Sequence, residues 1–171
     1  MNFLELAKAR FSVRSFKKDA IEAEKLNAIL EAGRVAPSAC NKQPQKVFVI
    51  QSEEARAKLA SVCRFTFDAP VILAVCYDKT RAWQNDLMPG YQSGETDAAI
   101  VCTHMMLEAW ELGIGSCWVG WYNADEITAA LGISENFVLS ALLPIGYPAD
   151  DAKPTKLHTK IRDIEDTVAF M

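Results

Sequence analysis

Two arginines and a serine near the N-terminus have the types and the spacing to bind an anion. They lie in the segment Arg10-Phe-Ser-Val-Arg14. If this segment is extended, alternate residues point to the same side, so Arg10, Ser12 and Arg14 share one face while Phe11 and Val13 pack on the other. A guanidinium group can donate two charge-assisted hydrogen bonds to one phosphate. The pattern favours a phosphate site, with an ordinary solvated loop as the alternative.

The distribution of charge favours the same chemistry more than the net charge does. The 171 residues carry a formal charge of −4, which argues against nucleic acid and anionic membranes as partners. Residues 10–18 and 153–162 each hold four basic side chains and no acidic one, which leaves 10 basic against 22 acidic residues elsewhere. Two basic segments at opposite ends of an acidic chain suggest convergence on a small anion. Two separate solvated loops are the alternative.

A second polar loop, Ala36-Pro-Ser-Ala-Cys-Asn-Lys-Gln-Pro44, lies between an expected helix and an expected buried strand. Proline-bounded loops in this position commonly carry ligand contacts. The alternative is an ordinary connection in which Ser38 and Asn41 bond to nearby backbone groups.

Several kinds of catalytic site are absent from the sequence. Four of the five cysteines lie in apolar stretches and none forms a CxxC pair, which favours buried reduced thiols over disulfides or zinc. Cys40 stands in the polar loop, but only His104 and His158 exist to activate a nucleophile. The sequence has no GxSxG or GxxxxGK[ST] motif, and Trp118 replaces the third glycine of a dinucleotide motif. We therefore expect no catalytic side chain and no metal site.

The apolar spacing predicts helices and strands that mix without a strict strand–helix–strand repeat. Helices are expected at 3–9, 22–35 and 96–112, after Ser52, and from Asn123 to Gly132. Buried strands are expected at 47–50, 70–77, 116–121 and 137–147, with a short β-like stretch at 168–170. This order predicts an α+β fold in three layers, and the length fits one domain, residues 1–171.

Nothing in the sequence predicts membrane insertion or export. The longest apolar stretch, Ala69 to Tyr77, has nine residues, whereas a membrane-spanning helix needs about 20. The N-terminal residues carry Glu5 and lack the apolar core of a secretory signal. We therefore expect a cytoplasmic protein.

Four motifs, in this order along the chain, resemble the FMN-dependent nitroreductase family in its short, single-domain branch. They are Arg10-x-Ser12-x-Arg14-x-Phe16, APSACNKQP, GIGSCWVG and LPIGYP, followed by the basic tail. The resemblance covers nearly the whole chain. It implies a three-layer α/β/α fold around a central mixed, mainly antiparallel sheet. It also implies a domain-swapped homodimer in which the C-terminal tail, about 150–171, reaches over the partner subunit.

The resemblance implies where FMN is bound. Arg10 and Ser12 match positions at the phosphate and ribityl end, and Arg14 matches a basic position near the N1/O2 edge of the isoalloxazine. A loop laid against the partner's flavin is matched by Pro37, Ser38, Ala39, Asn41 and Gln43. A segment along the flavin edge is matched by Trp118, Val119 and Gly120. A basic pair that completes the phosphate site is matched by Lys160 and Arg162. Asn41 and Gln43 either contact flavin or shape the loop.

The implied activity is a ping-pong, two-electron reduction of nitroaromatic, quinone or similar oxidised acceptors by NAD(P)H. The hydride passes through N5 of FMN, which agrees with the absence of an acid–base or nucleophile pattern. Arg14 would stabilise negative charge on the reduced flavin. Two alternatives remain: another flavin reaction on the same scaffold, of the reductive dehalogenase or flavin-destroying oxygenase kind, and a flavin-binding or sensing module without turnover.

The polar stretch 78–94, broken by Pro89-Gly90 and Gly94, is typical of a long excursion or lid. Its Trp83 and Tyr91 are candidate substrate-facing residues, with anchoring of the segment to the core as the alternative. Trp110 and Trp121 are expected in the core.

Overall fold

The centre of the molecule is a four-stranded sheet, and the computed structural model describes residues 2–171. Its strands are β1 (Gln45–Ile50), β2 (Val71–Asp78), β3 (Gly115–Ser116) and β4 (Phe137–Gly146), in the order β1-β2-β4-β3. Every neighbouring pair is antiparallel. An isolated parallel bridge between Ser12 and Ser116 adds the N-terminal segment beyond β3. The expected mixed, mainly antiparallel sheet is therefore confirmed.

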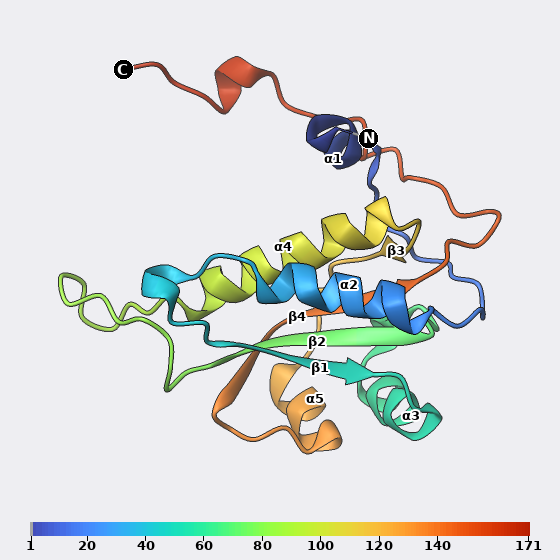
Figure 1. The fold of residues 1–171 in the computed structure, drawn as a ribbon, viewed down its shortest axis with the longest axis horizontal. Coiled ribbons are helices and arrows are strands. Elements are labelled where there is room, and N and C mark those ends of the chain that lie inside the picture. The colour runs from blue at the N-terminus through green and yellow to red at the C-terminus, as the bar shows by residue number, and fades with distance from the viewer. Residues whose placement is uncertain (1) are drawn as a thin grey trace.

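Helices cover both faces of this sheet, which makes three layers (Figure 1). Helices α2 (Ala23–Arg34) and α4 (Gly94–Glu111) pack on one face. Helices α3 (Glu53–Val62) and α5 (Ala124–Leu131) pack on the other. The short helix α1 (Phe3–Ala9) lies outside this sandwich, near the C-terminal end of α4 (Figure 1). The predicted α+β class and its three layers are confirmed.

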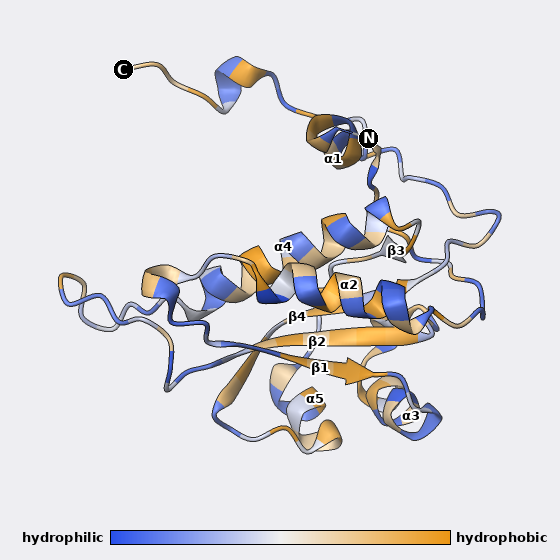
Figure 2. Ribbon diagram, in the orientation of Figure 1, coloured by the Kyte–Doolittle hydropathy of each residue, from blue (hydrophilic) through white to orange (hydrophobic). Residues whose placement is uncertain are grey.

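Strand β2 divides the core into two halves because its side chains alternate between the faces of the sheet. Leu73 and Val75 pack with α2 and α4, whereas Ile72, Ala74 and Cys76 pack with α3 and α5. The strand is hydrophobic along nearly its whole length, while the helices show polar residues on their outer faces (Figure 2). A strand covered on both faces needs such a continuous apolar run.

Local signals set the ends of several helices as the sequence predicts. The Ser52 side chain accepts a hydrogen bond from the Ala55 amide at the start of α3. Asn123 accepts from the amides of the first turn of α5, and Gly132 ends that helix in the left-handed conformation.

Two predicted strands are wrong. The strand expected at 116–121 is only two residues long, because Pro144 of β4 has no amide hydrogen to donate and the ladder stops beside it. Pairing returns only at an isolated bridge between Val119 and Leu142. Residues 168–170 form no strand, since this exposed part of the tail has no neighbouring strand; a short 3₁₀ turn, Ile164–Asp166, precedes them.

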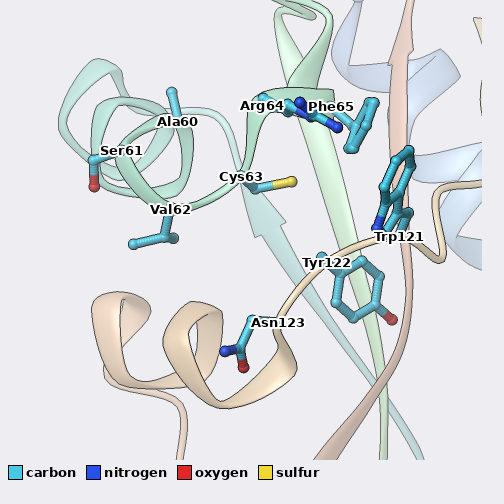
Figure 3. Close-up of a pocket in the computed structure, with 9 residues that line it drawn as sticks. All are labelled: Ala60, Ser61, Val62, Cys63, Arg64, Phe65, Trp121, Tyr122 and Asn123. Atoms are coloured by element: carbon cyan, nitrogen blue, oxygen red, sulfur yellow. The ribbon is translucent and has the colours of Figure 1, made fainter.

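The expectation that Trp121 belongs to the core is also wrong. Its side chain is 73% exposed and lies beside Arg64 and Phe65 (Figure 3). Trp110 is half-buried, and its ring meets the edge of Phe11 at 5.1 Å between centroids.

The C-terminal tail leaves the sandwich and runs past α1 (Figure 1). Most of residues 150–171 are exposed, among them the apolar Leu157, Ile161 and Ile164. Its contact with a partner subunit stays a prediction. Among residues 2–171, no helix is both long and apolar enough to cross a membrane.

Candidate functional site

The basic N-terminal segment and the C-terminal tail meet at a cavity of about 310 Å³. The segment is extended after α1 and is held to the sheet by the Val13 amide, which donates to the Ser116 carbonyl at 2.9 Å. Val13 is buried, and the residues on either side of it turn outward. The cavity is lined by Arg10, Phe11, Ser12 and Arg14 with Thr155, Leu157 and His158. The three predicted anion-binding residues therefore share one site. Phe11, which was expected on the opposite face with Val13, lines the same cavity, because its ring packs against Trp110 and His158.

The positive charge of this cavity comes from its two arginines. Lys17 is paired with Asp150 at 2.6 Å, and Lys18 is paired with Asp68. Neither Arg10 nor Arg14 makes an ion pair with a carboxylate anywhere in residues 2–171. Two uncompensated guanidinium groups beside a hydroxyl are a donor set for an anion.

The positive charges of Arg10 and Arg14 act on the thiol of Cys117, which directly follows β3. Burial raises the pKa of the Cys117 thiol, and the positive charges of Arg14 and Arg10 oppose that rise. Burial also raises the pKa of Cys76 and that of Cys102 to about 12, so these thiols stay protonated. Cys40 is the exposed cysteine. The four buried thiols agree with the prediction of inert cysteines.

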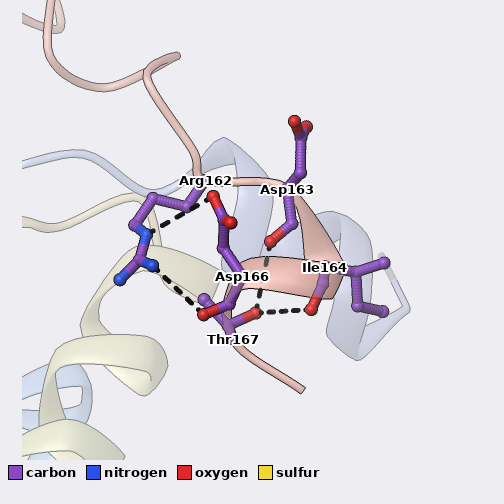
Figure 4. A network of polar contacts seen from close by, with 5 residues as sticks. All are labelled: Arg162, Asp163, Ile164, Asp166 and Thr167. Carbon is purple, nitrogen blue, oxygen red and sulfur yellow. Dashed lines mark hydrogen bonds and ion pairs between the residues drawn. The ribbon is translucent and has the colours of Figure 1, made fainter. Parts of the chain in front are cut away.

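The tail contributes residues other than the two basic ones that the sequence predicts. Arg162 donates to the Asp166 carbonyl at 3.1 Å and lies 3.8 Å from that residue's carboxylate, in a contact internal to the tail (Figure 4). Neither Lys160 nor Arg162 lines the cavity, whereas His158 does and meets Phe11 at 6.2 Å between ring centroids. Sequence reasoning missed Thr155, Leu157 and His158, although they lie within the basic segment 153–162.

The cavity and the adjoining segment fit a flavin mononucleotide chemically. Arg10, Ser12 and Arg14 supply donors for a phosphate. The buried hydroxyl of Ser116, at the base of the same segment, has no hydrogen-bond partner among the described residues. A Cβ on Gly120 would meet no atom within 4 Å, so a ligand can approach its backbone closely.

The segment expected along the flavin edge has one amide already in use. The Val119 amide donates to the Leu142 carbonyl at 2.9 Å, which fixes the segment to β4. Within residues 2–171 the amides of Trp118 and Gly120 donate no hydrogen bond. Trp118 is 36% exposed and Gly120 is exposed, so these two amides are the ones free to meet a ligand.

The loop at 37–43 is held in a strained shape by its own side chains. Cys40, Asn41 and Gln43 have φ values of 48°, 52° and 47°. The Ser38 hydroxyl accepts from the Gln43 amide at 2.9 Å, and the Gln43 side chain donates to that of Asn41 at 3.0 Å. Asn41 and Gln43 therefore bond to each other within the loop, and a contact of either with flavin stays a prediction.

Asp97, in the first turn of α4, joins this loop to the excursion 78–94. Asp97 is 2% exposed, and its carboxylate accepts from the Ala39 amide at 2.9 Å and from the Ser93 hydroxyl at 2.7 Å. The Ser93 hydroxyl in turn accepts from the Trp83 amide at 3.2 Å. Sequence reasoning missed Asp97, because one acidic residue at a helix start is common and its partners are distant in sequence.

Replacing Asp97 should loosen both segments. Asp97→Ala leaves a loop amide and a buried hydroxyl without their acceptor, so we expect the free energy of unfolding to fall by about 2–3 kcal/mol. Chemical denaturation measures this loss. Asp86→Ala, an exposed change in the same excursion, is the control and should stay within about 0.5 kcal/mol. Equal stability of the two variants would contradict the bridging role.

The loop at 37–43 and the basic N-terminal segment lie at opposite ends of α4 (Figure 1). The loop is bonded to Asp97 in the first turn, and Phe11 of the basic segment packs on Trp110 in the last. Asp97 and Trp110 are thirteen positions apart along the helix, or about 20 Å along its axis. Trp83 and Tyr91 belong to the loop end and do not line the basic cavity.

Comparison with known proteins agrees with this architecture. The model of the family described as "Nitroreductase family" matches residues 7–64 and 63–147. The chain therefore belongs to the Nitroreductase family, which makes it an oxidoreductase.

Individual relatives span almost the whole chain. A nitroreductase family protein from Clostridium difficile 630 is 36% identical, with a TM-score of 0.92 over 99% of this chain and 98% of that one. A nitroreductase-type protein from Exiguobacterium sibiricum 255-15, solved in complex with FMN, is 27% identical, with a TM-score of 0.84 over 100% and 98%. The "FMN reductase [NAD(P)H]" of Bacillus subtilis is 30% identical over 91% of this chain and 70% of its own length.

Proposed function

We propose that this protein is an FMN-dependent oxidoreductase that uses NAD(P)H to reduce nitroaromatic, quinone or similar oxidised acceptors. The observation that carries the proposal is the cavity at Arg10, Ser12 and Arg14, whose arginines have no acidic partner among residues 2–171, in a member of the Nitroreductase family. The FMN-bound relative supports the cofactor, and the name of the Bacillus relative supports the reductant. A cytoplasmic location stays a prediction.

The roles of the residues follow from their positions. The chemistry that FMN supplies is two-electron transfer from NAD(P)H to the acceptor. Arg10 and Ser12 would hold its phosphate, and Arg14 would stabilise negative charge near the N1/O2 edge. The amides of Gly120 and Trp118 would be the donors to the flavin edge, because the Val119 amide is occupied. Lys160 and Arg162 would contact the phosphate only if the C-terminal tail adopted a different conformation.

The site is proposed to be shared between two copies of the chain. Within one copy, about 20 Å of α4 separates the loop at 37–43 from the basic cavity, which supports a loop that serves the partner's flavin. Exposed apolar residues on α1 and the tail support the same assembly, since a second chain would cover them. They are Phe3, Leu4, Leu157, Ile161, Ile164, Val168 and Phe170.

Stepwise anaerobic reduction tests the proposed reaction. The purified protein, loaded with FMN, should lose its visible flavin absorbance when NADH or NADPH is added in separate experiments. A nitroaromatic or a quinone should then restore it. Free FMN at the same concentration is the control. A flavin that no pyridine nucleotide bleaches would leave only a binding or sensing module, and recovery with a halogenated aromatic but no other acceptor would favour a dehalogenase.

A further inference from the structure

A second and larger cavity, of about 600 Å³, opens on the side of the sheet covered by α3 and α5. It lies between the end of α3 and the segment that leads into α5 (Figure 3). None of its lining residues belongs to the basic cavity. The side chains that give it chemical character are Arg64, Phe65, Trp121 and Tyr122.

Three of these side chains form a stacked platform. The rings of Phe65 and Trp121 are 5.3 Å apart between centroids and inclined by 26°. The guanidinium carbon of Arg64 lies 4.8 Å from the first ring and 5.0 Å from the second. A guanidinium held over aromatic faces is attracted to them and keeps its donors pointing outward.

The platform is unused by the rest of the chain. The Arg64 side chain makes no hydrogen bond or ion pair with any residue from 2 to 171. Trp121 is 73% exposed, so most of a large apolar ring faces solvent. A free positive charge beside an exposed indole complements a flat ligand that carries a negative charge.

The position of the platform links it to the proposed flavin site. Trp121 directly follows Gly120, whose amide is proposed to meet the flavin edge. Ser116, which pairs with Ser12 in the basic segment, lies five residues before Trp121, at most about 17 Å along an extended chain. The second cavity therefore begins where the flavin-edge segment ends.

We propose that this cavity binds the electron acceptor, and that it selects planar aromatic acceptors carrying a carboxylate or a similar anionic group. The acceptor's ring stacks on Trp121 and its anionic group accepts hydrogen bonds from Arg64. This inference rests on the proposed function, because it assumes that the flavin lies along residues 118–120. It makes Arg64 a determinant of specificity, outside the residues that hold the cofactor.

Equilibrium binding to the oxidised holoenzyme, without NAD(P)H, tests the inference independently of turnover. The probes are 4-nitrobenzoate and its neutral counterpart 4-nitrobenzamide, followed by isothermal titration. We expect the wild-type protein to prefer the benzoate, and Arg64→Met to weaken benzoate binding about tenfold while changing benzamide binding less than twofold. Trp121→Leu should weaken both. Arg34→Met, which removes an exposed arginine paired with Glu31 on α2, is the matched control.

Each other outcome has a definite meaning. A wild-type protein that does not distinguish the two probes contradicts the inference, and so does an Arg64→Met variant that binds both as before. Loss of FMN from Arg64→Met, with unchanged benzoate binding in the reloaded enzyme, would make Arg64 a cofactor contact and overturn the assignment. If benzoate preference depends on Arg64 but no pyridine nucleotide bleaches the flavin, the proposed function fails and the anion site remains.

Discussion

Arg10→Ala is expected to raise the dissociation constant for FMN about 10- to 150-fold. The guanidinium lines the basic cavity and has no carboxylate partner among residues 2–171, so its charge is available to the phosphate. A lost hydrogen bond to a charged group costs about 1.5–3 kcal/mol, which corresponds to that range. Titration of the apoprotein with FMN, followed by the quenching of flavin fluorescence, measures the change directly.

A lysine in the same segment is the natural control for this experiment. Lys17 is already paired with Asp150 at 2.6 Å, so Lys17→Ala should change FMN affinity less than about twofold. The role of Arg14 is tested by a different measurement. Because Arg14 is proposed to stabilise negative charge beside the flavin ring, Arg14→Ala should lower the flavin midpoint potential. An Arg10→Ala protein that keeps its full flavin content through dialysis would remove Arg10 from the phosphate site.

Mixing two defective chains should restore function if each site is built from two subunits. Arg10→Glu places an acid in the anion cavity, and Asn41→Pro cannot adopt the φ of 52° that the loop requires. The Arg10→Glu homodimer then has two damaged cavities, and the Asn41→Pro homodimer has two damaged loops, so neither contains an intact site. In an equal mixture about half of the dimers contain both chains, and each has one intact site, so activity should recover to about a quarter of the wild-type value.

The control experiment mixes two variants that both damage the basic cavity. Chains carrying Arg10→Glu and Ser12→Asp both damage the basic cavity, so their mixture has no intact site and should stay inactive. Recovery in neither mixture would show that the loop at 37–43 serves the cavity of its own chain, despite the length of α4 between them. Co-expression with two affinity tags isolates the mixed dimers for the activity assay.

The parts of the fold that depend on local pattern were predictable from the sequence. The continuous apolar run of β2 predicts a strand covered on both faces, and Ser52, Asn123 and Gly132 mark helix ends by their own hydrogen bonding or backbone freedom. The strand expected at 116–121 failed for a reason outside its own residues. It depended on the partner strand β4, in which Pro144 has no amide hydrogen to donate.

The candidate site was predictable where its residues are close in sequence. Arg10, Ser12 and Arg14 share one cavity, as alternation along an extended segment predicts. Phe11 departs from that alternation, because its ring packs on Trp110, which is distant in the sequence. Asp97 and Trp121 were missed or misplaced because their roles depend on residues far away in the chain. The Asp97 carboxylate accepts from the amide of Ala39, and the Trp121 ring stacks on Phe65, each partner more than 50 residues away in the sequence.

The length of α4 has a consequence for how the protein would hold its cofactor at low concentration. Under the proposed shared site, a helix that keeps the loop and the cavity of one chain apart would require two chains to bind each flavin together. Cofactor retention and subunit association are then thermodynamically linked, so each strengthens the other. Dilution would release flavin and subunits together, and free FMN would draw monomers into dimers, which makes the flavin content of the protein depend on its own abundance.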